Sequence, residues 1–110
     1  MAHVRWLLAV EADIEQVLAF TLRRFGSRKY DEYGSLILEA LQALEVDPQA
    51  GKRRPEIAPE AWTYHIAQPG RRARHLFIYR LPRADLVEVL ALAYDGMDLP
   101  RMWRTREGAG

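Results

Sequence analysis

The sequence contains no cysteine and only three histidines among its 110 residues. Without cysteine, disulfide bonds, thiolate zinc sites and thiol nucleophiles are all excluded. The histidines, His3, His65 and His75, are too widely spaced to form a helical metal-binding pair. The sequence therefore predicts no metal and no cofactor, and the lack of cysteine fits a protein of the reducing cytoplasm.

Long hydrophobic runs are missing as well. The longest, residues 6–10 and 89–94, are far shorter than the about 20 apolar residues that cross a bilayer. The first run is followed directly by Glu11, with no region that resembles a signal-peptide cleavage site. We therefore expect a cytoplasmic protein without a signal peptide and without membrane contact.

The composition is that of a globular domain, since 49% of the residues are hydrophobic and 28% are charged. A chain of this length is expected to form one domain, residues 1–110, with its core over about residues 3–103. Basic side chains concentrate in the second half: residues 51–110 carry 11 basic and 7 acidic side chains, against 5 and 8 in residues 1–50. Arginine recognises phosphate and carboxylate equally well, so composition does not choose between partners.

Apolar side chains recur at intervals of three and four over two adjacent segments, which predicts two amphipathic helices. The first helix covers residues 12–25, and its repeating positions are Ile14, Val17, Leu18, Leu22 and Phe25. Gly26 ends it and Ser27 begins the second, whose repeating positions are Tyr30, Tyr33, Ile37, Leu41 and Leu44. So short a connection predicts an antiparallel helical hairpin with these positions in the core.

The remaining segments predict strands. Residues 3–8 form a first short strand, residues 47–61 a loop, and residues 62–67 and 74–81 a hairpin around the turn at 69–70. After a turn at 82–85, residues 86–94 are apolar at nearly every position, which indicates a strand covered on both faces. The predicted order is β-α-α-β-β-β, an α+β fold with the hairpin on one face of a mainly antiparallel four-stranded sheet. The other face is expected to remain partly bare.

Taken together, these segments resemble the ParE branch of the ParE/RelE toxin superfamily of toxin–antitoxin modules, over roughly residues 3–103. The resemblance is carried by DIEQVLAFTLRRFG, by the loop DPQAGKRRPEI, by RHLFIYRL with its His75, Tyr79 and Arg80, and by VLALAYDGMDLPRM. Two features depart from the family pattern. Tyr94 stands where many members have a histidine, and AVEAD replaces the Pro-x-Ala start of the first helix.

The resemblance implies a toxin that inhibits DNA gyrase and is not an enzyme. It also implies a ParD-like antitoxin, a ribbon-helix-helix protein whose flexible C-terminal segment wraps the toxin. Direct binding of nucleic acid is not expected. The candidates for partner binding are the basic clusters, the helix residues outside the apolar stripes, the last two strands and the tail: Phe20, Leu38, Arg53, Arg54, Arg72, Arg74, Tyr79, Arg80, Tyr94, Met97, Asp98, Met102 and Trp103.

Two alternatives stay open. The RelE branch cuts messenger RNA on the ribosome, and His75, Arg80 and Tyr94 are the candidate catalytic residues for that chemistry, which needs proton transfer and a cation at one phosphate. Strand alternation places His75 and Tyr79 on one face and Arg80 on the other, which disfavours it. The second alternative is a non-toxic member that only binds its partner. The tail, residues 97–103, either folds back on the sheet or docks a partner.

Overall fold

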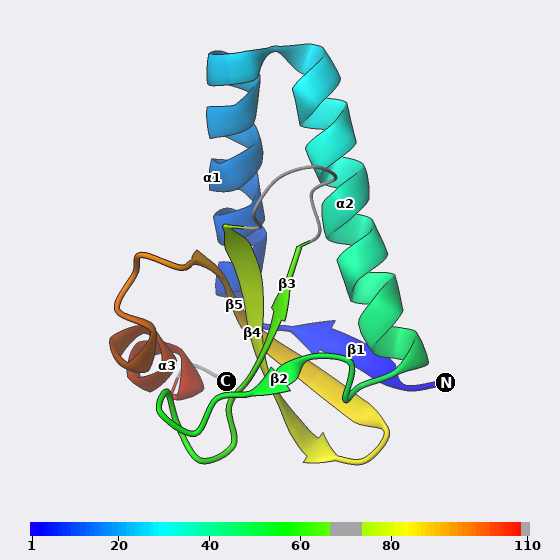
Figure 1. Cartoon of the computed structure of the whole chain (residues 1–110), viewed down its shortest axis with the longest axis vertical. Coiled ribbons are helices and arrows are strands. Elements are labelled where there is room, and N and C mark those ends of the chain that lie inside the picture. Colours follow the sequence, from blue (N-terminus) through cyan, green and yellow to red (C-terminus); the bar gives the residue numbers. More distant parts are fainter. Residues whose placement is uncertain (67–73, 109–110) are drawn as a thin grey trace.

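The computed structural model describes residues 1–66 and 74–108 (Figure 1). Its long arm is an antiparallel hairpin of α1, Leu8–Phe25, and α2, Ser27–Val46. Gly26 alone joins the helices, with φ at 90°, a backbone conformation that glycine adopts without steric cost. The predicted hairpin is therefore confirmed, although α1 begins four residues earlier than its apolar repeat indicated. Neither of these two helices, nor α3 below, is long and apolar enough to span a membrane.

In the part of the chain that the structure describes, the sheet has five strands in the order β1-β5-β4-β3-β2. Their bounds are β1 His3–Trp6, β2 Lys52–Arg53, β3 Trp62–His65, β4 His75–Arg83 and β5 Leu86–Tyr94. β1 runs parallel to β5, and the other neighbours are antiparallel. The α+β class is confirmed, but the count of four strands is wrong. β2 lies within the predicted loop, and two residues are too few to show an alternating pattern.

β5 lies between β1 and β4, and every residue from Leu86 to Ala93 is buried, as predicted for a strand covered on both faces. A β-bulge interrupts its pairing with β4: Ile78 pairs with Ala91, but Tyr79 pairs with Val89. Leu90 is thus the extra residue, and it joins the same core cluster as Ala91.

The turn predicted at residues 82–85 is shorter in the structure. β4 continues to Arg83, and its pairing with β5 shifts register between Arg80 and Arg83. Pro82 lies within this irregularity, where its missing N–H removes no regular ladder bond. Only Ala84 and Asp85 remain for the turn.

The second sheet face is only partly bare, as predicted, because the tail folds back on part of it as α3, Leu99–Glu107 (Figure 1). Asp98 caps this helix through its side chain, which accepts a hydrogen bond from the Arg101 N–H. Leu99 and Trp103 are buried against a core that includes Leu76, Ile78 and Leu90. Trp103 is 2% exposed and is therefore not available as a partner contact. Nine residues show too little apolar repeat for the sequence to predict this helix.

The opposite face packs on the helical hairpin. Its core is formed by Val10 of α1, by the inner face of α2, and by side chains of β4 and β5. The buried residues of α2 are Tyr33, Ile37, Ala40 and Leu44. Ala40 lies outside the predicted stripe, and Leu41, which belongs to it, is half-buried. Tyr30 was predicted in the same stripe but is 38% exposed, because it lies near the tip of the hairpin, which extends past the ends of the strands (Figure 1).

Candidate functional site

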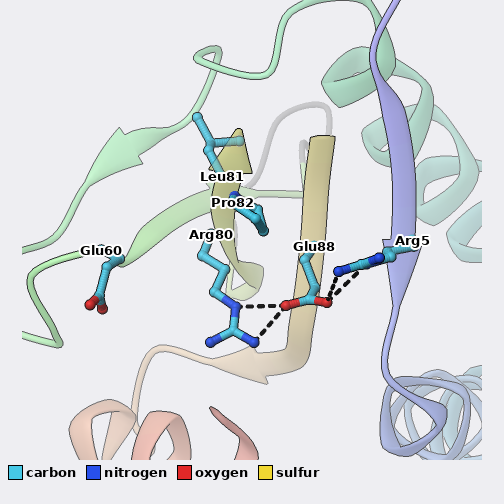
Figure 2. A pocket seen from close by; sticks show the side chains of 6 residues that line it. All are labelled: Arg5, Glu60, Arg80, Leu81, Pro82 and Glu88. Carbon is cyan, nitrogen blue, oxygen red and sulfur yellow. Dashed lines mark hydrogen bonds and ion pairs between the residues drawn. The ribbon is translucent and has the colours of Figure 1, made fainter. Parts of the chain in front are cut away.

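Three strands bring a charged cluster together on the sheet face that α3 partly covers. Arg80 of β4 and Arg5 of β1 both bind the carboxylate of Glu88 in β5 (Figure 2). The Glu88 oxygens lie 2.6 Å from the Arg80 guanidinium and 2.8 Å from that of Arg5. These residues line an open pocket of about 430 Å³, with Glu60 on its far side. Arg80 was a predicted contact residue, whereas Arg5 and Glu88 were not considered.

The two arginines determine the ionisation of Glu88. Burial by itself would raise the pKa of this carboxyl, but the hydrogen bonds and positive charges of Arg80 and Arg5 outweigh it and lower the pKa. Glu88 is therefore fully ionised at neutral pH. The sequence held one signal of the cluster, because Glu88 is the single charged residue in an otherwise apolar buried strand and needs a partner there.

A second group of predicted residues surrounds a groove between α1 and α3. His75, Tyr94, Met97 and Met102 line this groove, whose volume is about 380 Å³. Tyr94 and Met97 are 46% and 40% exposed, so both can be reached from solvent. The structure thus brings the three partner-binding candidates Tyr94, Met97 and Met102 to one surface, together with His75.

His75 is directed toward the helical hairpin. Its Nδ1 lies 2.6 Å from the Tyr33 hydroxyl, and the two rings meet edge to face. Burial raises the pKa of Tyr33 to about 12 and lowers the pKa of His75 below its usual 6.5, with a smaller upward effect of Asp95 and a downward one of Arg74. Both side chains are therefore neutral at pH 7.

The stability of the protein is expected to fall on acidification because of His75. Because the pKa of His75 in the folded protein lies below 6.5, the unfolded chain takes up this proton at a higher pH than the folded protein does. The stability is therefore full above about pH 6.5 and decreases as the pH falls toward the folded pKa. Thermal unfolding between about pH 7 and pH 5 measures this. A His75→Gln variant serves as the control. An equally steep pH dependence in that variant would show that another group is responsible.

The three candidates for RNA cleavage do not converge on one place. His75 faces Tyr33 on the helix side of the sheet, with its ring centroid 6.3 Å from that of Tyr94. Arg80 lies on the other side and its guanidinium is occupied by Glu88. A proton donor and a cation that act on the same phosphate must both reach it, which these positions do not allow.

Tyr79 was a partner-binding candidate, but it is fully buried. Its hydroxyl donates to the Pro48 carbonyl oxygen at 2.8 Å and accepts from the Gly51 N–H at 3.2 Å. Its ring stacks on Trp62, with the centroids 6.1 Å apart. Strand alternation predicted that Tyr79 lies on the same sheet face as His75. At the position of Tyr79 this face belongs to the hydrophobic core. Tyr79 therefore holds the loop before β2 and does not meet a partner.

The basic candidates are more dispersed. Arg53 is exposed in the edge strand β2 and donates to the Pro59 carbonyl oxygen, while Arg54 pairs with Glu56. Arg74 is exposed at the start of β4, and Arg72 lies outside the described residues. No group of three or more His, Asp and Glu side chains within residues 1–66 and 74–108 could hold a metal ion.

The helical hairpin presents several apolar side chains to solvent. Phe20 and Leu38, both predicted candidates, are 54% and 55% exposed. Leu22 and Phe25 are also exposed, although their spacing had assigned them to the buried stripe. The reason is the length of the hairpin, whose tip extends past the ends of the strands (Figure 1). Sequence periodicity indicates which face turns inward but not where the sheet ends.

A largely buried ion pair connects the tail to the first helix. The Arg106 guanidinium of α3 binds both oxygens of Asp13 in α1, at 2.8 and 2.9 Å, and donates to the Leu90 carbonyl oxygen at 2.8 Å. Asp13 also accepts the Leu92 N–H. The hydrogen bond to Asp13 raises the pKa of Arg106 against the opposing effect of burial. This cluster forms part of the groove, and sequence reasoning missed it because its members are 93 residues apart.

Comparison with known proteins agrees with this architecture. A family model described as ParE toxin of type II toxin-antitoxin system, parDE, matches residues 4–99. A chain of the solved "Chromosomal ParDE TA system from P. aeruginosa" superposes with a TM-score of 0.69 at 17% sequence identity, over 86% of this chain and 96% of that chain. That likeness shows a shared fold. No curated protein sequence matches the chain.

Proposed function

Because the chain belongs to the ParE toxin family of type II toxin–antitoxin systems, we propose that it inhibits DNA gyrase by protein contact and that a ParD-like antitoxin neutralises it. The family match over residues 4–99 is the observation that carries this proposal. The positions of His75 and Arg80 on opposite faces of the sheet support contact over RNA cleavage.

Two exposed apolar surfaces support a partner that wraps the toxin. The first is the helical hairpin, on which the side chains of Phe20, Leu22, Phe25 and Leu38 are exposed. The second is the groove with Tyr94, Met97 and Met102. A flexible antitoxin segment that folds on binding can cover separated surfaces of this kind, since it orders only as it makes contact.

Expression of the chain in bacteria, with and without the antitoxin, tests the proposal. Plasmid supercoiling and the integrity of a chosen messenger RNA are followed after induction. We expect relaxed plasmid, intact RNA and arrested growth, with growth restored by the antitoxin. Cut RNA together with normal supercoiling would instead identify an endonuclease of the RelE type, and unimpaired growth would identify a non-toxic member.

Replacing Phe20 with alanine is expected to weaken the complex with the antitoxin about tenfold or more, as for an aromatic anchor at the centre of an interface. The free energy of unfolding should change little, because the side chain is 54% exposed. Leu8→Ala is the matched control, since Leu8 is 80% exposed at the other end of the same helix. Equal affinities of the two variants would remove Phe20 from the interface.

A further inference from the structure

We propose that Glu88 is an internal anion that blocks a latent phosphate-binding site on the sheet, and that it thereby keeps RNA from the face that carries Arg80. The inference rests on the proposed function, in that the wild-type protein acts by contact and does not cleave RNA. One buried carboxylate, that of Glu88, thus prevents this sheet face from binding nucleic acid.

Sheet register determines the site. Glu88 pairs directly with Arg5 across the parallel β1–β5 ladder and with Arg80 across the antiparallel β4–β5 ladder. Side chains that stand opposite each other on neighbouring strands are within contact distance. The three strands therefore hold two guanidinium groups on either side of one carboxylate (Figure 2).

The arginines are accessible, whereas the carboxylate is not. The side chains of Arg5 and Arg80 are 54% and 26% exposed, and that of Glu88 is 9% exposed. Both guanidinium groups border the open pocket. Guanidinium binds phosphate and carboxylate with the same paired hydrogen bonds, so these two groups would bind a phosphate that replaced Glu88.

The charges around the pocket cancel in the wild-type protein. Arg5 and Arg80 provide two positive charges, and Glu88 and Glu60 provide two negative ones. The Glu60 side chain stands apart from the cluster in Figure 2, whereas Glu88 lies between the arginines. Glu88 is thus the negative charge in direct competition with an incoming phosphate.

Stability alone does not account for this arrangement. Replacing a buried ion pair with well-packed apolar residues is often neutral or stabilising, and the neighbours Val87 and Val89 show that β5 accepts apolar side chains on its other face. A carboxylate that binds two arginines does affect which ligands the protein can bind. It neutralises the positive charges that binding of the RNA backbone requires.

The test compares Glu88→Gln with the wild-type protein for binding of a short fluorescent single-stranded RNA, measured by anisotropy. The variant keeps the shape of the side chain but removes its negative charge, so that the two guanidinium groups no longer share an anion. We expect its affinity to rise about tenfold or more, since each hydrogen bond between charged partners contributes about that factor. Inorganic phosphate should compete for the same site.

Two matched variants control the experiment. Glu60→Gln makes the same change in net charge in the same pocket and should bind RNA far more weakly than Glu88→Gln. The double variant Arg80→Gln/Glu88→Gln should lose the gain. Near-ultraviolet circular dichroism verifies folding, and Glu88→Thr, which suits a strand, replaces the glutamine variant if that one unfolds.

The outcomes separate this inference from the proposed function. If Glu88→Gln binds RNA no better than Glu60→Gln, or if the wild-type protein already binds it as tightly, the carboxylate does not block a phosphate site. Gyrase inhibition by the wild-type protein is measured in parallel. Its failure would overturn the proposed function and leave the binding result unchanged.

Discussion

Replacement of Asp13 with alanine is expected to lower the free energy of unfolding by about 3 kcal/mol, because it leaves the Arg106 guanidinium without its anion in a largely buried place. The side chains of Asp13 and Arg106 are only 12% and 15% exposed. The Leu92 N–H also loses its acceptor. Urea denaturation measures the change.

Two further variants verify the cause. The double variant Asp13→Ala/Arg106→Met should recover part of the loss, since it leaves no buried charge unpaired. Glu32 offers a contrast, because its exposed carboxylate also binds two cations, Arg28 and Lys29, yet Glu32→Ala should change stability little. A cost for Asp13→Ala as small as that for Glu32→Ala would show that α3 does not depend on the ion pair.

Replacement of Gly51 with alanine should cost about 2 to 4 kcal/mol, through steric overlap and the loss of a buried hydrogen bond. An added Cβ would overlap the Thr63 carbonyl oxygen and the Tyr79 hydroxyl, and would lie 3.0 Å from Tyr79 Cε1. Tyr79 is fully buried, so its ring has no free space into which it could move. The loop before β2 would have to shift.

Gly34→Ala is the matched control for this change. Apart from its chain neighbours and the backbone of the helix itself, nothing lies within 4 Å of a Cβ added there, and the position is inside α2. Alanine at this site should stabilise the protein by up to about 1 kcal/mol, since glycine disfavours a helix. Thermal unfolding should therefore move in opposite directions for the two variants. A shift of the same sign in both would contradict the close packing around Gly51.

Local patterns accounted for most of the fold. The spacing of apolar residues predicted α1 and α2, and the unbroken apolar run predicted that β5 is buried on both faces. The missed elements, β2 and α3, are short and depend on contacts with distant segments. α3 is stabilised by a sheet core and by Asp13, and neither is visible in the sequence near residue 99.

The candidate sites were less predictable. Strand alternation correctly separated His75 from Arg80, but it could not tell that Tyr79 lies in the core. Exposure at the tip of the hairpin depends on where the strands end. Phe20 was therefore correctly predicted to be exposed, whereas Phe25 was wrongly assigned to the buried stripe. The cluster around Glu88 could not be predicted without the order of the strands, because its Arg5 is 83 residues from Glu88 in the chain.

The arrangement of the exposed surfaces is consistent with the proposed contact function. The second sheet face is partly covered by α3, and the two arginines that remain accessible there bind one carboxylate. The exposed apolar surfaces lie elsewhere, on the hairpin and in the groove at the end of β5. These apolar surfaces are thus separate from the sheet face that carries Arg80.

Supercoiling of relaxed plasmid by purified gyrase, in the presence of increasing toxin, tests the central proposal most directly. We predict loss of supercoiling with accumulation of cleaved DNA, and recovery when antitoxin is added beforehand. Messenger RNA on programmed ribosomes should remain intact at the same toxin concentration. Normal supercoiling together with cleaved RNA would contradict the account and return His75, Arg80 and Tyr94 to consideration as an active site.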